Sequence, residues 1–379
     1  MPFDPETLAK PNHDEFSRQR FVFGLKTFIA GDLTPGNRAV MDRQVVPAFK
    51  RAHGRGPENR RELRQAMERA PYHQTWSSLM LLAQEMMWES VEDTVDRQID
   101  DLNAAAHVTR PRGSLRVNPK LEIPRYITAV DHHVMPGSYY VETEADDVRA
   151  GAIFDAGANM YHLGVRGRQT DVMGLTIAAV VRGEYPDLVP QRVLDMGCTI
   201  GQSTLAVAQS FPRAETHAID VGAPVIRYGH ARAEAMGIPV HFSQQNAEKT
   251  DFATGFFDLI VSHILFHETS AKGAVRILEE THRLLKPGGV MVHMEVPVRY
   301  RDLPLYDQVI RGWQTHYNAE PFWDAVCSMD LVKAAKAAGF KNARDGYVLW
   351  SRDPEREPRR LTATPNQGRE WRYVLTARR

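Results

Sequence analysis

Apolar residues in the first third of the chain recur at intervals of three and four, the spacing of one face of an α-helix. This pattern predicts a largely helical region from residue 14 to about residue 105, with Pro71 at the start of one helix. Two further helices are predicted near 144–163 and 170–183. The longest stripe of apolar positions comprises Leu79, Leu82, Met86, Val91, Val95, Ile99 and Leu102.

The pattern changes near residue 185, where short apolar runs begin to alternate with amphipathic stretches. This alternation predicts an α/β fold in which a parallel sheet is joined by right-handed crossovers. We expect a mainly helical domain over residues 1–185 and an α/β domain over 186–379. Residues 108–140, rich in proline and glycine, predict irregular chain with one short strand. The expected strands are 192–196, 215–220, 240–243, 257–262 and 290–296, the expected helices lie near 202–210, 223–236 and 271–285, and a last helix and two strands lie in "AAKAAGFKNARDGYVLW" and "EWRYVLTARR".

Composition narrows the choice of partners. The 379 residues contain 47 Lys and Arg and 47 Asp and Glu, so the formal net charge is zero. Nucleic-acid and anionic-membrane surfaces need excess basic charge, and we expect neither partner. The two cysteines favour a reducing compartment. Because no signal-peptide pattern and no apolar run of roughly 20 residues is visible, we expect a cytoplasmic protein.

The stretch "VLDMGCTIGQST" predicts a strand, a glycine turn and a helix. Gly197 and Gly201 allow a sharp turn close to a ligand. A dinucleotide turn has glycine at the position of Thr199, and Asp195 at the strand end would repel a pyrophosphate. A carboxylate there suits a ligand with a positively charged ammonium group. The expected ligand contacts in this turn are Asp195, Gly197, Cys198, Thr199 and Gly201.

The next two strands end in polar residues that suit the rest of such a ligand. Asp220 closes the second strand, where an acid accepts hydrogen bonds from ribose hydroxyls. Asn246 follows the third strand, and its side-chain amide can bond an adenine edge. The neighbouring Val221 and Ala247 are expected to contact the same ligand. The alternatives are a helix N-cap for Asp220 and a turn residue for Asn246.

Taken together, these motifs resemble those of class I S-adenosylmethionine-dependent methyltransferases over roughly half of the chain. "VLDMGCTIG" matches that family's glycine turn and "AID" its ribose acid. "FDLIVSHILFHE" matches its fourth strand, and "ILEETHRLLKPGGVMV" matches the following helix, turn and fifth strand. The resemblance implies S-adenosylmethionine as cofactor and a Rossmann-like, seven-stranded, mostly parallel sheet whose last strand is antiparallel. Thr199 replaces a glycine of the family, which is tolerable if this residue does not need a positive φ. Asn246 replaces the commoner Asp.

Methyl transfer needs a base only when the acceptor has a proton to lose. His267, Glu268 and His263 follow the fourth strand and are the candidate catalytic residues. His267 is the candidate base, with packing against the next helix as the alternative. His263 and His267 are four residues apart, but no third ligand stands at a recognisable spacing, and we expect no metal.

The acceptor is expected to lie under a lid insertion at about 297–327, which is rich in aromatic residues. Trp313, His316, Tyr317 and Asn318 are placed near it, together with Glu320 and Trp323; packing against the N-terminal helices is the alternative. His133 in "DHH" is also a substrate candidate, as is His132, although a surface loop is the favoured interpretation of this stretch. Tyr161, Arg166 and Gln169 are candidates to close over the methionine end of the cofactor.

The sequence therefore favours methyl transfer to a small organic acceptor, with oxygen as the favoured atom. Sulfur, nitrogen or carbon acceptors and a non-catalytic, S-adenosylmethionine-binding regulatory protein remain open. An NAD-dependent oxidoreductase is disfavoured by Asp195, and a methylase of macromolecules by the even charge. The N-terminal helices are expected to cover the ligand face, to form a homodimer, or both.

Overall fold

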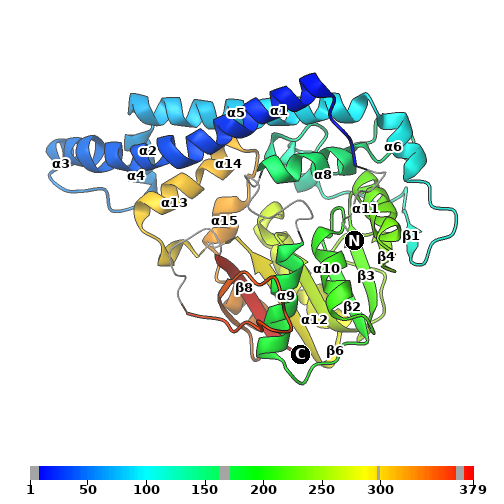
Figure 1. Ribbon diagram of the computed structural model, residues 1–379. Helices are drawn as coiled ribbons and strands as arrows, with labels where there is room; N and C mark the ends of the chain where they lie inside the picture. Colours follow the sequence, from blue (N-terminus) through cyan, green and yellow to red (C-terminus); the bar gives the residue numbers. More distant parts are fainter. Residues whose placement is uncertain (1–7, 162–170, 297–298, 364–370) are drawn as a thin grey trace.

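A computed structural model describes residues 8–161, 171–296, 299–363 and 371–379. Two long helices, α1 (His13–Phe28) and α5 (Pro71–Asp96), pack along each other across one side of the molecule, and the sheet lies on the other side (Figure 1). The helical region predicted before residue 105 is therefore present. Its remaining helices are α2 (Thr34–Val40), α3 (Val46–His53), α4 (Arg60–Met67) and α6 (Ile99–Ala105), with π-helical turns at Ile29–Leu33 and Met41–Val45.

The sheet has eight strands in the order β1-β4-β3-β2-β5-β6-β8-β7. All neighbours are parallel except β8, which is antiparallel to both β6 and β7. The predicted Rossmann-like fold with a mostly parallel sheet is confirmed, with one strand more than the expected seven. The strands are β1 (Ser114–Arg116), β2 (Arg192–Met196), β3 (Glu215–Asp220), β4 (His241–Gln244), β5 (Phe257–His263), β6 (Leu285–Glu295), β7 (Arg344–Leu349) and β8 (Trp371–Arg378).

The additional strand comes from the proline- and glycine-rich segment. Ser114 of β1 pairs in parallel with His241 of β4, so this segment extends the sheet at its edge. Gly113 allows the approach, because a Cβ there would lie 2.1 Å from the carbonyl oxygen of Val240. The domain boundary at residue 185 stays a prediction, since β1 belongs to the sheet although it precedes that residue.

Helices cover both faces of the sheet, so its central strands bury apolar residues on both sides. Val193 and Leu259 pack with α9 on one face, and Leu194 and Ile260 pack with α12 on the other. The covering helices are α9 (Val172–Glu184), α10 (Gln202–Ser210), α11 (Ala223–Ala235), α12 (Ala271–Leu284) and α16 (Leu331–Ala337). The helix α8 (Arg149–Tyr161) packs against α5 and α11, and α7 (Arg125–Thr128) is a single short turn of helix.

The predicted apolar stripe is wrong at Leu82, which is 47% exposed. Because α1 packs on one side of α5 and α8 on another, the buried surface of α5 is wider than a single stripe and includes Trp76 and Trp88. The stripe also crosses a helix end, since α5 stops at Asp96 and α6 begins at Ile99. Long surface helices fold by burying such faces rather than by propensity alone.

The predicted insertion contains three short helices, α13 (Leu305–Arg311), α14 (Trp313–Tyr317) and α15 (Trp323–Cys327). They lie between the N-terminal helices and the sheet (Figure 1). Trp313 donates its indole N–H to Ser77 Oγ at 2.8 Å, and Tyr306 donates its hydroxyl to the carbonyl of Thr34 at 3.2 Å. The insertion thus joins the two halves of the chain. Among the described residues, no helix is long and apolar enough to cross a membrane.

Candidate active site

A cavity of about 360 Å³ lies at the carboxyl ends of β2, β3, β4 and β5, where parallel sheets bind ligands. One part is lined by residues that follow these strands, and the other by the N-terminal half and the insertion. The first part contains Asp195, Gly197, Cys198, Thr199, Asp220, Val221, Asn246, Ala247 and His263, and the second contains Trp88, Tyr126, His133, Tyr139, Phe154, Tyr161, Gln314, Glu320 and Trp323, with His267 and Glu268 between them.

The turn between β2 and α10 depends on two glycines, of which Gly197 lines the cavity. Gly197 has φ +72°, and a Cβ there would lie 2.7 Å from Leu265 Cδ1. Gly201 has φ +75° and caps α10 without lining the cavity. Both positions lie in the left-handed region that favours glycine.

Thr199, which replaces a glycine of the family, adopts a positive φ of 45°. Its backbone N–H donates to Asp220 Oδ2 at 2.9 Å, and its hydroxyl donates to the carbonyl of Cys198 at 2.8 Å. The condition under which threonine would be tolerated without strain is therefore not met. The turn between β2 and α10 imposes the conformation whatever the residue, and a β-branched side chain adopts it at a cost of ~1–2 kcal/mol.

Two buried carboxylates flank this turn. Asp195 Oδ2 accepts from the Thr204 hydroxyl at 2.6 Å, whereas Oδ1 is buried and accepts no hydrogen bond within the described part of the chain. Burial raises the pKa of Asp195 to about 7. Asp220 accepts from the backbone N–H of Thr199 and of Gly222, and burial raises its pKa as well. An acceptor buried without a donor is costly, so Asp195 suits a cationic ligand group.

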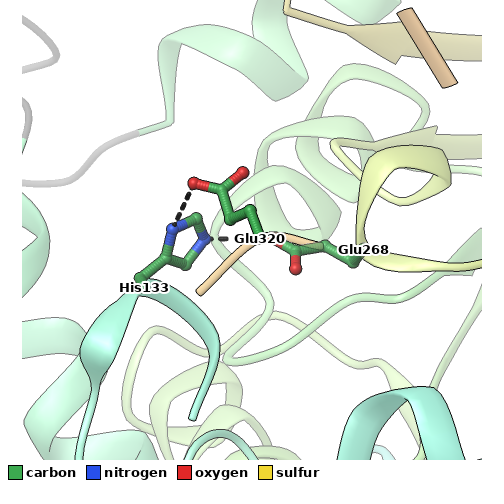
Figure 2. Close-up of side chains that lie close together, drawn as sticks. All are labelled: His133, Glu268 and Glu320. Atoms are coloured by element: carbon green, nitrogen blue, oxygen red, sulfur yellow. Dashed lines mark ion pairs between the residues drawn. The ribbon is translucent and has the colours of Figure 1, made fainter. Parts of the chain in front are cut away.

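A second polar group lies on the other side of the cavity. His133 places Nε2 2.9 Å from Glu268 Oε1 and Nδ1 3.0 Å from Glu320 Oε1, so its ring stands between the two carboxylates (Figure 2). Burial opposes the charge on His133, yet neighbouring groups, both glutamates included, raise its pKa well above the usual value. Burial likewise opposes the charge of Glu268, and the adjacent histidines outweigh it and lower the pKa of that carboxyl.

The surface-loop interpretation of "DHH" is wrong. His132 is fully buried, and His133 lines the cavity from the short 3₁₀ turn His132–Val134. The indole of Trp88 and the amide of Gln84 on α5 both donate to the carbonyl of His133, at 2.8 and 3.0 Å. The segment is irregular, as predicted, but α5 and the insertion cover it.

His267 is held by a carboxylate that the sequence did not single out. Its Nδ1 lies 2.6 Å from Oε2 of Glu295, the fully buried last residue of β6. Glu295 Oε1 also accepts from the backbone N–H of Leu265 and Phe266. Burial opposes the charge of His267, but Glu295 and two further glutamates outweigh it and raise its pKa to about 9. A charged residue that ends the apolar strand "VMVHME" was the available signal.

The structure separates the predicted substrate residues into two groups. Trp313 packs against Trp76, and neither it nor His316 nor the partly exposed Tyr317 lines the cavity. Asn318 is buried beside the polar group, with its amide nitrogen 2.8 Å from Glu320 Oε1 and 3.3 Å from His133 Nδ1. The substrate roles of all of them stay predictions.

The remaining candidates lie as follows. His263 ends β5 rather than lying on a helix, and its Nδ1 is 3.2 Å from Ser203 Oγ. Tyr161 lines the cavity with its hydroxyl 3.0 Å from His133 Nδ1, which places it on the acceptor side of the glycine turn. Asn246 Oδ1 accepts from the backbone N–H of Glu248, and its contact with an adenine stays a prediction. Arg166 and Gln169 lie outside the described residues.

Comparison with known proteins gives a consistent result for the cofactor half. The family described as "Methyltransferase domain" matches residues 193–289. A demethylmenaquinone methyltransferase of Thermus thermophilus is 32% identical over 108 residues, 28% of this chain and 48% of that protein. A ubiquinone/menaquinone biosynthesis C-methyltransferase of Nitrosospira multiformis is 30% identical over 174 residues, 44% of this chain and 67% of that protein.

The chain belongs to the class I S-adenosylmethionine-dependent methyltransferases. The match spans only about half the length of the Thermus relative. Among solved structures, an O-methyltransferase family protein from Burkholderia thailandensis is 12% identical, with 78% of this chain and 72% of that one covered and a TM-score of 0.46.

The residues of this methyltransferase fit the cofactor of its family. Asp195 Oδ1 offers a buried acceptor that suits the ammonium group. Gly197 has no Cβ, which would otherwise clash with Leu265. Asp220 places its carboxylate at the end of β3. Cys198 lines the cavity with a neutral thiol, because burial raises its pKa well above the usual value.

Proposed function

We propose that the protein transfers a methyl group from S-adenosylmethionine to a small organic acceptor, with oxygen as the favoured acceptor atom. The observation that carries this proposal is the single cavity of about 360 Å³ shared by Asp195, Asp220 and His267. S-adenosylmethionine, when bound, supplies an electrophilic methyl group on its sulfonium. The protein contributes proximity, orientation and exclusion of water.

The lining of the cavity favours a small, partly apolar acceptor. The aromatic side chains of Trp88, Tyr139 and Phe154 line its N-terminal side, while the polar group of His133, Glu268 and Glu320 stands opposite the glycine turn. Such a mixture of apolar walls and a few placed polar groups is typical of sites that bind small ligands.

His267 is the proposed proton acceptor. Glu295 fixes the ring through Nδ1, so Nε2 is the nitrogen left to take a proton from an acceptor hydroxyl. The pKa of about 9 keeps His267 charged at neutral pH, and the positive charge of bound S-adenosylmethionine would favour its neutral form. The proton of the acceptor would then be held by a ring that Glu295 stabilises in its charged form.

The test is methyl transfer from radiolabelled S-adenosylmethionine to a panel of small hydroxyl compounds. We expect His267→Ala to lower the rate by about 10²–10⁴-fold, the usual contribution of a positioned base, with S-adenosylhomocysteine affinity unchanged. His107→Ala is the matched control, because His107 is exposed and lies outside the cavity. Full activity of His267→Ala would contradict a base and favour an acceptor with no proton to lose, such as a thioether.

A carbon acceptor is the second candidate, because the Nitrosospira relative is named a C-methyltransferase. The region matched by the family, residues 193–289, contains neither His133 nor Glu320 and therefore does not extend to much of the acceptor side. Including phenolic and quinol-type compounds in the panel distinguishes methylation on oxygen from methylation on carbon by the mass fragments of the product. The cytoplasmic location, the homodimer and the absence of a nucleic-acid partner also stay proposals.

A further inference from the structure

The polar group opposite the glycine turn has the composition and spacing of a metal site. His133, Glu268 and Glu320 each offer one ligand atom, and these atoms lie within 4.8 Å of one another (Figure 2). The three residues come from separate parts of the chain: the turn His132–Val134, the 3₁₀ turn Phe266–Glu268 and the link between α14 and α15. Metal–oxygen and metal–nitrogen bonds of about 2.0–2.2 Å bring neighbouring ligand atoms to such separations.

Several atoms of this group are buried without a hydrogen bond. Within the described part of the chain, Oε2 of Glu320 and Oε2 of Glu268 accept no hydrogen bond. Water cannot easily replace that bond, because Glu320 is only 1% exposed and Glu268 only 8%. Nε2 of the fully buried His132 is also without one and lies 3.6 Å from Glu268 Oε2. Native proteins seldom leave buried polar atoms unpaired, so these atoms indicate a missing ligand.

The orientation of His133 fits coordination through Nε2. Its Nδ1 lies 3.0 Å from the Tyr161 hydroxyl and 3.0 Å from Glu320 Oε1, whereas Nε2 faces Glu268. Histidines bound to metals commonly use their second ring nitrogen for such a contact, which fixes the ring. Glu320 Oε1 then orients the ring, and Oε2 remains for the metal.

The partners of the two carboxylates also allow a metal ion. Across the described residues, the ion pairs of Glu268 and Glu320 involve only histidines. An imidazole is itself a common metal ligand, whereas a lysine or arginine beside the carboxylates would compete with a metal ion. Two carboxylates and an imidazole form a mixed oxygen and nitrogen set, which suits divalent first-row ions.

We propose that His133, Glu268 and Glu320 bind one divalent cation of the Mn²⁺ or Zn²⁺ class. His132 stands beside this position next to Glu268, and His267 lies beside it with Nε2 3.6 Å from Glu268 Oε1 and from Glu320 Oε2. The ion would bind an oxygen of the acceptor and hold it near His267, as metal ions do when they orient substrates. The metal site is a property separate from methyl transfer, and metal binding can be measured without any acceptor.

The experiment uses the full chain after removal of metals with a chelator. Isothermal titration with MnCl₂ and with ZnCl₂, and elemental analysis after dialysis, should give one bound ion per chain with a Kd of about 1 μM or tighter. Glu320→Gln and His133→Asn should each weaken binding by about 10- to 100-fold or more. Circular dichroism checks that both variants fold, and Glu268→Gln is a third variant if either does not.

Glu280→Gln is the matched control, because Glu280 is a buried glutamate that bonds Thr250 and Arg283 and lies outside the cavity. It should bind the ion like the unaltered chain. The proposal is overturned if the unaltered chain binds neither ion, or if every one of these variants that folds binds as tightly as the control. Because the experiment measures the bound ion, a failure of the metal-site proposal is distinguishable from a failure of the proposed methyl transfer.

Discussion

The two sides of the cavity are built in different ways. On the cofactor side, Asp195 is the next-to-last residue of β2 and Asp220 is the last residue of β3, and their positions follow from local sequence. On the acceptor side, His133, Glu268 and Glu320 meet from segments 135 and 52 residues apart (268 − 133 and 320 − 268). The sheet therefore supplies the cofactor side of the cavity. The packing of the N-terminal half and of the insertion decides which side chains lie opposite it.

The largest expected change on the cofactor side comes from Asp195→Asn. Its unpaired Oδ1 is the proposed partner of the ammonium group, and a hydrogen bond to a charged group contributes about 1.5–3 kcal/mol. S-adenosylhomocysteine affinity, measured by calorimetry, should fall by about 10- to 150-fold. Metal binding at the acceptor side should not change. Loss of both would show that the two sides are coupled and would break the comparison.

The pH dependence of cofactor binding also tests whether Asp195 binds the ammonium group. Burial raises the pKa of Asp195 to about 7, and a cationic ammonium binds the deprotonated carboxylate. S-adenosylhomocysteine affinity should thus be constant above pH 7 and fall by about tenfold per pH unit below it, because binding must then displace a proton. Calorimetry between pH 5.5 and 8.5 measures this. The Asp195→Asn variant should bind weakly with no such slope, and an equal slope in that variant would assign the proton elsewhere.

The smallest expected change comes from Thr199→Gly. Glycine removes the cost of a positive φ of 45° but adds freedom to the unfolded chain and loses the hydroxyl contact with Cys198. These effects oppose each other, so the free energy of unfolding should change by less than about 1 kcal/mol and cofactor affinity by less than about threefold. Thr199→Ala keeps the strain without the hydroxyl and separates the two effects. A large gain in affinity for Thr199→Gly would mean that the natural turn is compromised.

The strands and helices of the α/β half could be predicted closely because each depends on a local pattern. The strands β2 and β3 have the bounds that the sequence predicts, and the candidate ligand residues at their ends follow from the rule for parallel sheets. Leu82 shows the limit of this reasoning, since its exposure depends on which other helices cover α5. Thr199 shows another, because its φ is set by the turn rather than by its own preference.

The sequence by itself determined which residue types stand at the successive strand ends of the cofactor side. They are an acid and a glycine turn, then a second acid, then an amide. Only the tertiary structure brought His133 between Glu268 and Glu320 and placed Glu295 behind His267. Periodicity encodes which face of an element is buried, but it carries no information on which distant segment covers that face. The acceptor side depends on such coverage, and therefore only the folded chain reveals it.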